Sequence, residues 1–159
     1  MNDDLHRNAQ RVVEAARALG FDLQVHSFPE GTRTAADAAA AIGVEVGAIV
    51  KSLVLRSDDG PVLALVSGAN RADLAAVAAA LGVTGVHQAD ARTAREATGF
   101  PVGGTPPFGH PAPLSTVTDA DLLGFDEVWA AAGTPNLVFP IPPDDLVRAT
   151  AATVARIAE

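Results

Sequence analysis

The spacing of apolar residues predicts a helix followed by a strand at the start of the chain. Apolar residues recur at helical intervals over residues 5–19, with Asp3 or Asp4 available as the cap and Gly20 as the stop. Residues 21–28 then alternate between apolar and polar side chains. That alternation is typical of a strand with one face buried, so we expect an extended segment there.

The next part of the chain predicts a second helix and a β-hairpin. Thr34 is followed three residues later by Asp37, as in a capping box with aspartate in place of Glu or Gln, and Gly43 ends the alanine-rich helix. Residues 48–55 are almost continuously apolar, which favours a strand buried on both faces. A short turn leads into a second strand over residues 61–67, so the pair should form a hairpin.

The rest of the chain mixes helices with strands in the same way. The predicted elements are a helix over 71–81 capped by Asn70, a strand over 83–87, a helix from Asp90 to Gly99, a helical turn capped by Asp119, strands over 127–132 and 137–141, and a last helix from Pro142. Hairpins interspersed with helices predict an α+β fold with a mixed sheet rather than a doubly wound one. The length and the absence of a linker predict one domain over residues 1–159.

Composition removes several classes of function. The 159 residues include no cysteine, so thiolate catalysis and zinc–thiolate sites are excluded, and no pair of histidines has metal-ligand spacing. We therefore expect no metal and no cofactor. The net charge of −8 argues against extended binding to DNA or RNA, although a small pocket could still take one end of a nucleic acid. No apolar run is long enough for a membrane span, and the acidic start is unlike a signal peptide, so we expect a cytoplasmic protein.

Lys51 is the only lysine, and it interrupts the apolar strand over residues 48–55. The other ten basic residues are arginines. Burying an ammonium group costs free energy unless a partner or a wet cleft receives it, and lysine shifts its pKa readily. The alternative is a strand-edge lysine that reaches water. We interpret Lys51 as a candidate site residue.

A loop rich in glycine and proline is the second candidate. Residues 99–110 contain four glycines and three prolines, a combination that predicts a rigid loop with outward backbone N–H groups. Such groups bind an anion, a carbonyl oxygen or a developing oxyanion. A plain covering loop is the alternative. The spacing fits neither a Walker loop nor a dinucleotide fingerprint.

Four segments in this order resemble the YbaK/ProX family of aminoacyl-tRNA deacylases, which is related to the editing domain of bacterial prolyl-tRNA synthetase. They are residues 34–39, 49–54, 98–109 and 132–136. The resemblance extends over roughly residues 5–151. It implies a compact α+β domain around a mixed, barrel-like sheet, and hydrolysis of the ester that joins a wrong amino acid to the 3′-terminal adenosine of a tRNA, often tRNA(Pro).

The resemblance also implies roles for particular residues. Lys51 would hold the terminal adenosine end, and the loop from Gly103 to Pro107 would offer its backbone N–H groups to the aminoacyl carbonyl. A water molecule or the substrate's own 2′-hydroxyl would then attack, with no protein nucleophile. The implied catalytic set is Lys51, Gly103, Gly104 and Pro107, and the implied substrate-binding set is His26, Phe28, Thr34, Thr105, Gly109 and Gly133.

This chain departs from the YbaK branch around the expected amino-acid pocket. Pro106 stands where YbaK-like members usually carry serine, Thr34 where they place an aromatic residue, and Val138 where they have an acidic residue. Phe28 would keep the other pocket aromatic. These differences affect the expected preference for cysteine and leave deacylation itself as the expectation.

Several other residues have weaker claims to a site. His26 and His110 could each act as a general base near the pocket, because histidine titrates near neutral pH. His87 is expected to be structural, Trp129 to lie in the core, and Asp119 to be a helix cap.

Two alternatives to a deacylase stay open. The domain could bind aminoacyl-tRNA or a synthetase without hydrolysing anything, since the acidic surface suits a protein partner. It could also be a small-molecule hydrolase that uses the loop as an oxyanion hole. The expected partner is thus the aminoacylated 3′ end of tRNA, with an aminoacyl-tRNA synthetase as a second candidate, and we expect no membrane and no DNA.

Overall fold

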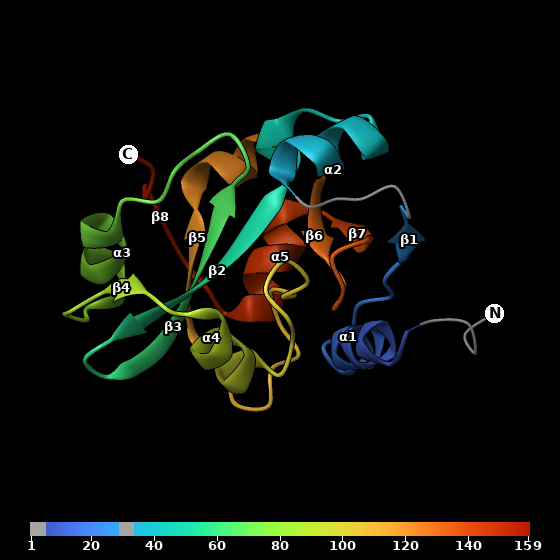
Figure 1. The fold of residues 1–159 in the computed structure, drawn as a ribbon. Coiled ribbons are helices and arrows are strands. Elements are labelled where there is room, and N and C mark those ends of the chain that lie inside the picture. The colour runs from blue at the N-terminus through green and yellow to red at the C-terminus, as the bar shows by residue number, and fades with distance from the viewer. Residues whose placement is uncertain (1–5, 29–33) are drawn as a thin grey trace.

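The computed structural model describes residues 6–28 and 34–159. Its helices are α1 (Arg7–Ala18), α2 (Ala35–Ile42), α3 (Leu74–Leu81), α4 (Ala91–Thr98) and α5 (Pro143–Thr150), with short 3-10 turns η2 (Val46–Ala48) and η3 (Ala120–Gly124). Its strands are β1 (His26–Ser27), β2 (Val50–Ser57), β3 (Gly60–Ser67), β4 (His87–Gln88), β5 (Ser115–Asp119), β6 (Val128–Ala131), β7 (Leu137–Ile141) and β8 (Thr153–Ala155). Figure 1 shows the helices around the strands, with α5 between β5 and the β6–β7 pair.

The strands form two sheets. The larger has the order β4-β2-β3-β5-β8 and is mixed, because β3, β5 and β8 run parallel while β2 runs antiparallel to β3. The smaller, β1-β7-β6, is antiparallel. A single parallel bridge between Ile49 and Trp129 joins them. The α+β fold with a mixed sheet is confirmed, but the strands described here do not close into a barrel.

The β2–β3 hairpin is confirmed, and a proline fixes its hydrogen-bond pattern. Pro61 lies opposite Arg56. Since proline has no N–H, this pair is a non-hydrogen-bonded one, and the antiparallel pattern alternates from there along an unbroken register. Ser52, opposite Leu65, is therefore also in a non-hydrogen-bonded pair. Its backbone N–H and C=O point away from β3, toward the other edge of β2.

Apolar side chains cover both faces of the large sheet. On one face Val50 and Val54 pack with Phe100 and Phe108 of the glycine–proline loop in the main core. On the other, Leu55 belongs to a second cluster that includes residues of β3, β5 and α3. Because both faces of β2 are covered, the residues around Lys51 form a continuous apolar run. The glycine–proline loop is anchored to the main core by Phe100 and Phe108, which are both buried.

Three predicted caps are present. The hydroxyl of Thr34 accepts from the backbone N–H of Asp37 at 3.0 Å, Asp90 accepts from that of Thr93 at 2.7 Å, and Asp119 accepts from that of Asp121 at 3.0 Å. The alanine-rich helix ends at Gly43 as expected. No helix in the described ranges is long and apolar enough to cross a membrane.

The N-terminal predictions were only partly right. The first helix is capped by His6, while Asp3 and Asp4 lie outside the described residues. The strand predicted over 21–28 is reduced to His26–Ser27, because β7 pairs with only those two residues. The apolar residues before them pack against the core as irregular chain.

Elsewhere the errors concern caps and long-range pairing. Asn70 does not cap α3, which begins at Leu74 with Asp73 as its cap. The strand predicted over 83–87 is displaced to His87–Gln88. Strands β5 and β8 were not predicted, since each is short and is held by parallel neighbours distant in the sequence.

Candidate functional site

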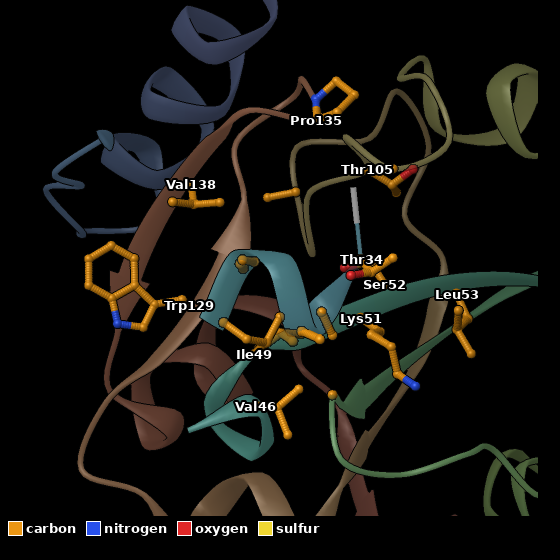
Figure 2. Close-up of a pocket in the computed structure, with 18 of the residues that line it drawn as sticks. Thr34, Val46, Ile49, Lys51, Ser52, Leu53, Thr105, Trp129, Pro135 and Val138 are labelled. Atoms are coloured by element: carbon orange, nitrogen blue, oxygen red, sulfur yellow. The ribbon is translucent and has the colours of Figure 1, made fainter. Parts of the chain in front are cut away.

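A cavity of about 560 Å³ lies where the two sheets separate (Figure 2). Its walls come from the start of α2, from η2, β2, β6 and β7, and from the glycine–proline loop. The lining residues used below are Thr34, Lys51, Ser52, Gly103, Thr105, Trp129, Pro135 and Val138.

The cavity follows an unpaired stretch of the β2 edge. On the side away from β3, strand β4 pairs only with Leu55 and Arg56, and Ile49 bridges to Trp129. Between these contacts no described strand pairs with residues 51–54. An open strand edge offers free backbone groups. Here those groups face a cavity.

Lys51 lies in the cavity wall, and its ammonium group is hydrogen-bonded within the protein. The side chain is half-buried, and its Nζ donates a hydrogen bond to the backbone carbonyl of Asn70 at 2.5 Å. Figure 2 shows the ammonium turned away from Thr34 and Thr105. Burial lowers the pKa of Lys51 and Arg71 lowers it further, while Asp119 acts in the opposite direction.

Two carboxylates hold the residue that receives Lys51. The side-chain amide of Asn70 donates to Asp119 at 2.9 Å and to Asp121 at 2.7 Å. Asp119 is only 1% exposed and also accepts from the backbone N–H of Ser67 at 3.1 Å. Asn70, expected as a helix cap, instead links the buried carboxylate to the lysine.

The loop presents fewer amides than its sequence suggested. Pro106 and Pro107 have no N–H, and the N–H of Gly104 donates to the carbonyl of Pro101 at 3.0 Å. The N–H groups of Gly103 and Thr105 remain, and both residues line the cavity. The hydroxyl of Thr105 donates to Pro101 at 3.2 Å, which tightens the turn.

Gly104 is required by close backbone packing. A Cβ atom at this position would lie 2.6 Å from the Cα of Thr134, in the turn between β6 and β7. Gly103, with φ of 89°, has the left-handed conformation that favours glycine. These two glycines place the loop directly against the β6–β7 turn.

The structure brings together four of the ten expected site residues. Lys51, Gly103, Thr105 and Thr34 line the cavity. The other six do not: Gly104 and Pro107 are buried in the loop, Gly109 faces Ala15, Gly133 packs on Asn8, and His26 and Phe28 lie outside the lining. Gly104 and Pro107 are instead buried parts of the same loop that carries Gly103 and Thr105.

Trp129 is a further candidate site residue, which the sequence did not reveal. We expected it in the core, but it is half-buried and lines the cavity. The exposed ring of His26 meets it edge-on, with ring centroids 5.1 Å apart. Ser52 and Pro135 were also missed. The sequence did offer one indication for each of these two residues: Ser52 is next to Lys51, and Pro135 belongs to the segment 132–136 that resembles the family.

The other two histidines raised as candidates lie elsewhere. His110 Nε2 lies 2.9 Å from the carbonyl of Pro106, and burial lowers the pKa of His110. Its ring therefore braces the loop from outside the cavity lining. His87 is exposed beside the carbonyl of Gly85. Within the described residues there is no cluster of three or more His, Asp or Glu that could hold a metal ion.

A second hollow of about 690 Å³ adjoins the first and shares Pro135 with it. Arg95 is its cationic residue, and no carboxylate side chain is among the described residues that line either hollow. The first hollow is the candidate site because it contains both Lys51 and the free loop amides.

Comparisons with known proteins agree on one family. Residues 29–149 match the model of the aminoacyl-tRNA editing domain. The "Putative Cys-tRNA(Pro)/Cys-tRNA(Cys) deacylase EbsC" of Enterococcus faecalis is 26% identical over 151 residues, covering 94% of this chain and 92% of the relative.

Two solved structures are similar to nearly the whole chain. A "putative trans-editing enzyme for prolyl tRNA synthetase" has a TM-score of 0.93 and 47% identity, covering 98% of this chain and 99% of the other. The hypothetical protein APE2540 has a TM-score of 0.86 and 33% identity, covering 94% of this chain and 99% of its own.

Proposed function

The chain belongs to the aminoacyl-tRNA editing domain family, and from this premise we propose that it is a deacylase that hydrolyses mischarged tRNA in trans. Residues 1–159 would act as one editing domain in the cytoplasm, where aminoacyl-tRNA is made. The relatives named above for tRNA(Pro) and prolyl-tRNA synthetase favour tRNA(Pro) as the substrate.

One observation carries the proposal. Within the segment 103–107, the amides of Gly103 and Thr105 have no hydrogen-bond partner among the described residues, and both residues lie in the wall of the cavity that also contains Lys51. Fixed N–H donors stabilise negative charge that develops on a carbonyl oxygen, and removing one such donor typically slows acyl transfer by about 100- to 1,000-fold. These N–H donors and Lys51 therefore support ester hydrolysis that uses no protein nucleophile.

The reaction follows from these groups. The oxygen of a water molecule attacks the ester carbonyl carbon while the carbonyl oxygen gains negative charge against the Gly103 and Thr105 amides. The carbonyl double bond then re-forms as the bond from that carbon to the ribose oxygen breaks, and the ribose oxygen takes up the proton that the attacking water gives up. The products are the free amino acid and the tRNA 3′ end. The rigid loop keeps the donors aligned from the start, which lowers the reorganisation that the transition state requires.

Lys51 would supply the cation that receives the tRNA end. With a net charge of −8, the protein would hold only the end of the tRNA and leave its body to other contacts. An aminoacyl-tRNA synthetase is the partner that we propose for those contacts. The described residues of the lining include no carboxylate side chain that would repel a phosphate at the cavity wall.

The test is hydrolysis of tRNAs charged with Ala, Cys, Ser, Thr or Pro, with the free amino acid esters assayed beside them. We expect rapid loss of at least one mischarged tRNA(Pro) and little loss of the free esters. Equal rates on tRNA and free ester would support a small-molecule hydrolase. No hydrolysis of any species, together with measurable tRNA binding, would support a binding module.

A further inference from the structure

Ser52 carries a hydroxyl group that the protein does not satisfy. The residue lies in β2 beside Lys51 and lines the cavity, yet its Oγ is buried and has no hydrogen-bond partner among the described residues. Leaving a buried polar group unpaired costs roughly 1–3 kcal/mol. Such groups are rare in native proteins and call for an explanation. A ligand that completes the bond is one.

The backbone of Ser52 is also available at the cavity. Because Pro61 fixes the pairing of β2 with β3, the N–H and C=O of Ser52 point toward the open edge of β2. The hydroxyl is buried as it stands, so a change of χ1 rotamer is needed to bring it to the same edge of the strand. Ser52 can thus present two oxygen acceptors, Oγ and the backbone carbonyl, to one bound group.

The other two hydroxyl groups of the described lining already have hydrogen-bond partners within the protein. The hydroxyl of Thr34 accepts from the N–H of Asp37, and that of Thr105 donates to Pro101. Lys51 is itself a cation, and the described lining has no carboxylate. Ser52 therefore stands out among these side chains, because its hydroxyl has no hydrogen-bond partner among the described residues.

We propose that Ser52 is a substrate-contacting residue that accepts hydrogen bonds from the free α-ammonium group of the aminoacyl ester. This inference rests on the proposed deacylase function. The α-ammonium distinguishes an aminoacyl ester from an N-acylated one. Ser52 would thus select substrates whose amino group is unmodified, and would help to orient the ester carbonyl toward Gly103 and Thr105.

The experiment compares wild type with Ser52→Ala on one mischarged tRNA and on the same tRNA after N-acetylation of its amino acid. We expect wild type to prefer the free amino form by kcat/KM. Ser52→Ala should lose about tenfold or more on that form, the usual scale for a hydrogen bond to a charged group, and should hydrolyse the N-acetylated form as wild type does. The preference of Ser52→Ala for the free amino form over the N-acetylated form would then be smaller than that of wild type.

Thr118→Val is the matched control. Thr118 also has a buried, unpartnered hydroxyl, but it lies in β5 and does not line the cavity. Both variants should unfold at or above the wild-type temperature, because each removes a hydroxyl that lacks a partner. Only Ser52→Ala should change the preference between the two substrates.

The outcomes separate this inference from the proposed function. A wild type that hydrolyses neither substrate, although its melting is cooperative, overturns the deacylase function and the Ser52 role with it. A wild type that hydrolyses the free amino form, but whose preference is unchanged in Ser52→Ala, overturns the Ser52 role alone. Equal losses on both substrates, or a markedly lower unfolding temperature, would likewise show that Ser52 acts through structure.

Discussion

The ammonium of Lys51 is bonded to the backbone carbonyl of Asn70, a residue 19 positions further along the chain. The side chain of Asn70 in turn bonds the buried carboxylate of Asp119. A lone lysine in an apolar strand is thus held by a backbone carbonyl with a negative charge behind it. Its position is set by β2, by the segment after β3 and by the end of β5 together.

Asp119→Asn should weaken this arrangement. The change removes the negative charge near Lys51 and one strong acceptor for Asn70, which typically costs about 1.5–3 kcal/mol for a bond to a charged group. We expect kcat/KM to fall by roughly tenfold, with a lower unfolding temperature. Steady-state deacylation and thermal melting measure the two effects. Asp121→Asn is the control, since it is exposed and bonds the same amide; a loss as large as that of Asp119→Asn would refute the special role of the buried carboxylate.

The pH dependence of deacylation should show the lowered pKa of Lys51. Desolvation and Arg71 disfavour the charged lysine, and Asp119 favours it. If the cation binds the tRNA end, kcat/KM corrected for spontaneous hydrolysis should fall with rising pH at a pH below the ordinary lysine pKa. In Asp119→Asn the negative charge that raises the pKa of Lys51 is lost, so the fall in kcat/KM should move to lower pH. A limb that stays in place in the variant would contradict the coupling.

Gly104→Ala should damage the loop. The new methyl group would lie 2.6 Å from the backbone of Thr134, and overpacking of this kind typically costs about 1–3 kcal/mol. We expect a lower unfolding temperature and a loss of turnover, because the loop that carries Gly103 and Thr105 must shift. Gly124→Ala is the control, since its added methyl meets no atom within 4 Å. Full activity in Gly104→Ala would argue against the loop as the catalytic element.

Trp129→Ala should change which amino acids are accepted. Removing the indole from the cavity wall enlarges the space, and differences of one methylene in an apolar pocket alter discrimination by about 1–3 kcal/mol. Larger aminoacyl groups should be hydrolysed better relative to small ones. The panel of charged tRNAs measures the shift. His26→Ala, which removes only the ring behind Trp129, should alter the preference much less.

Local patterns were enough to predict much of the fold. The caps at Thr34, Asp90 and Asp119 and the β2–β3 hairpin depend on neighbouring residues, and all are present. Strands β5 and β8 have partners distant in the sequence, so no local pattern marks them. The strand expected over residues 21–28 failed for the same reason, since alternation supplies no partner by itself.

The candidate site was predictable in part. Lys51 was conspicuous as the only lysine, and the glycine–proline loop by its composition. The sequence could not show which loop amides are free, because that depends on the bond from Gly104 to Pro101. Nor could it show the link through Asn70, or that Trp129 faces a cavity. Each of these depends on tertiary contacts.

The central claim is tested most directly by deacylation of a mischarged tRNA(Pro) by wild type, Lys51→Ala and Arg56→Ala. Arg56 is the matched control, because it is an exposed cation on the same strand and lies outside the cavity lining. We predict that Lys51→Ala lowers kcat/KM by about 10- to 100-fold, as expected for the loss of a charged hydrogen bond, while Arg56→Ala remains within about twofold of wild type. Equal activity of Lys51→Ala and wild type would contradict the account.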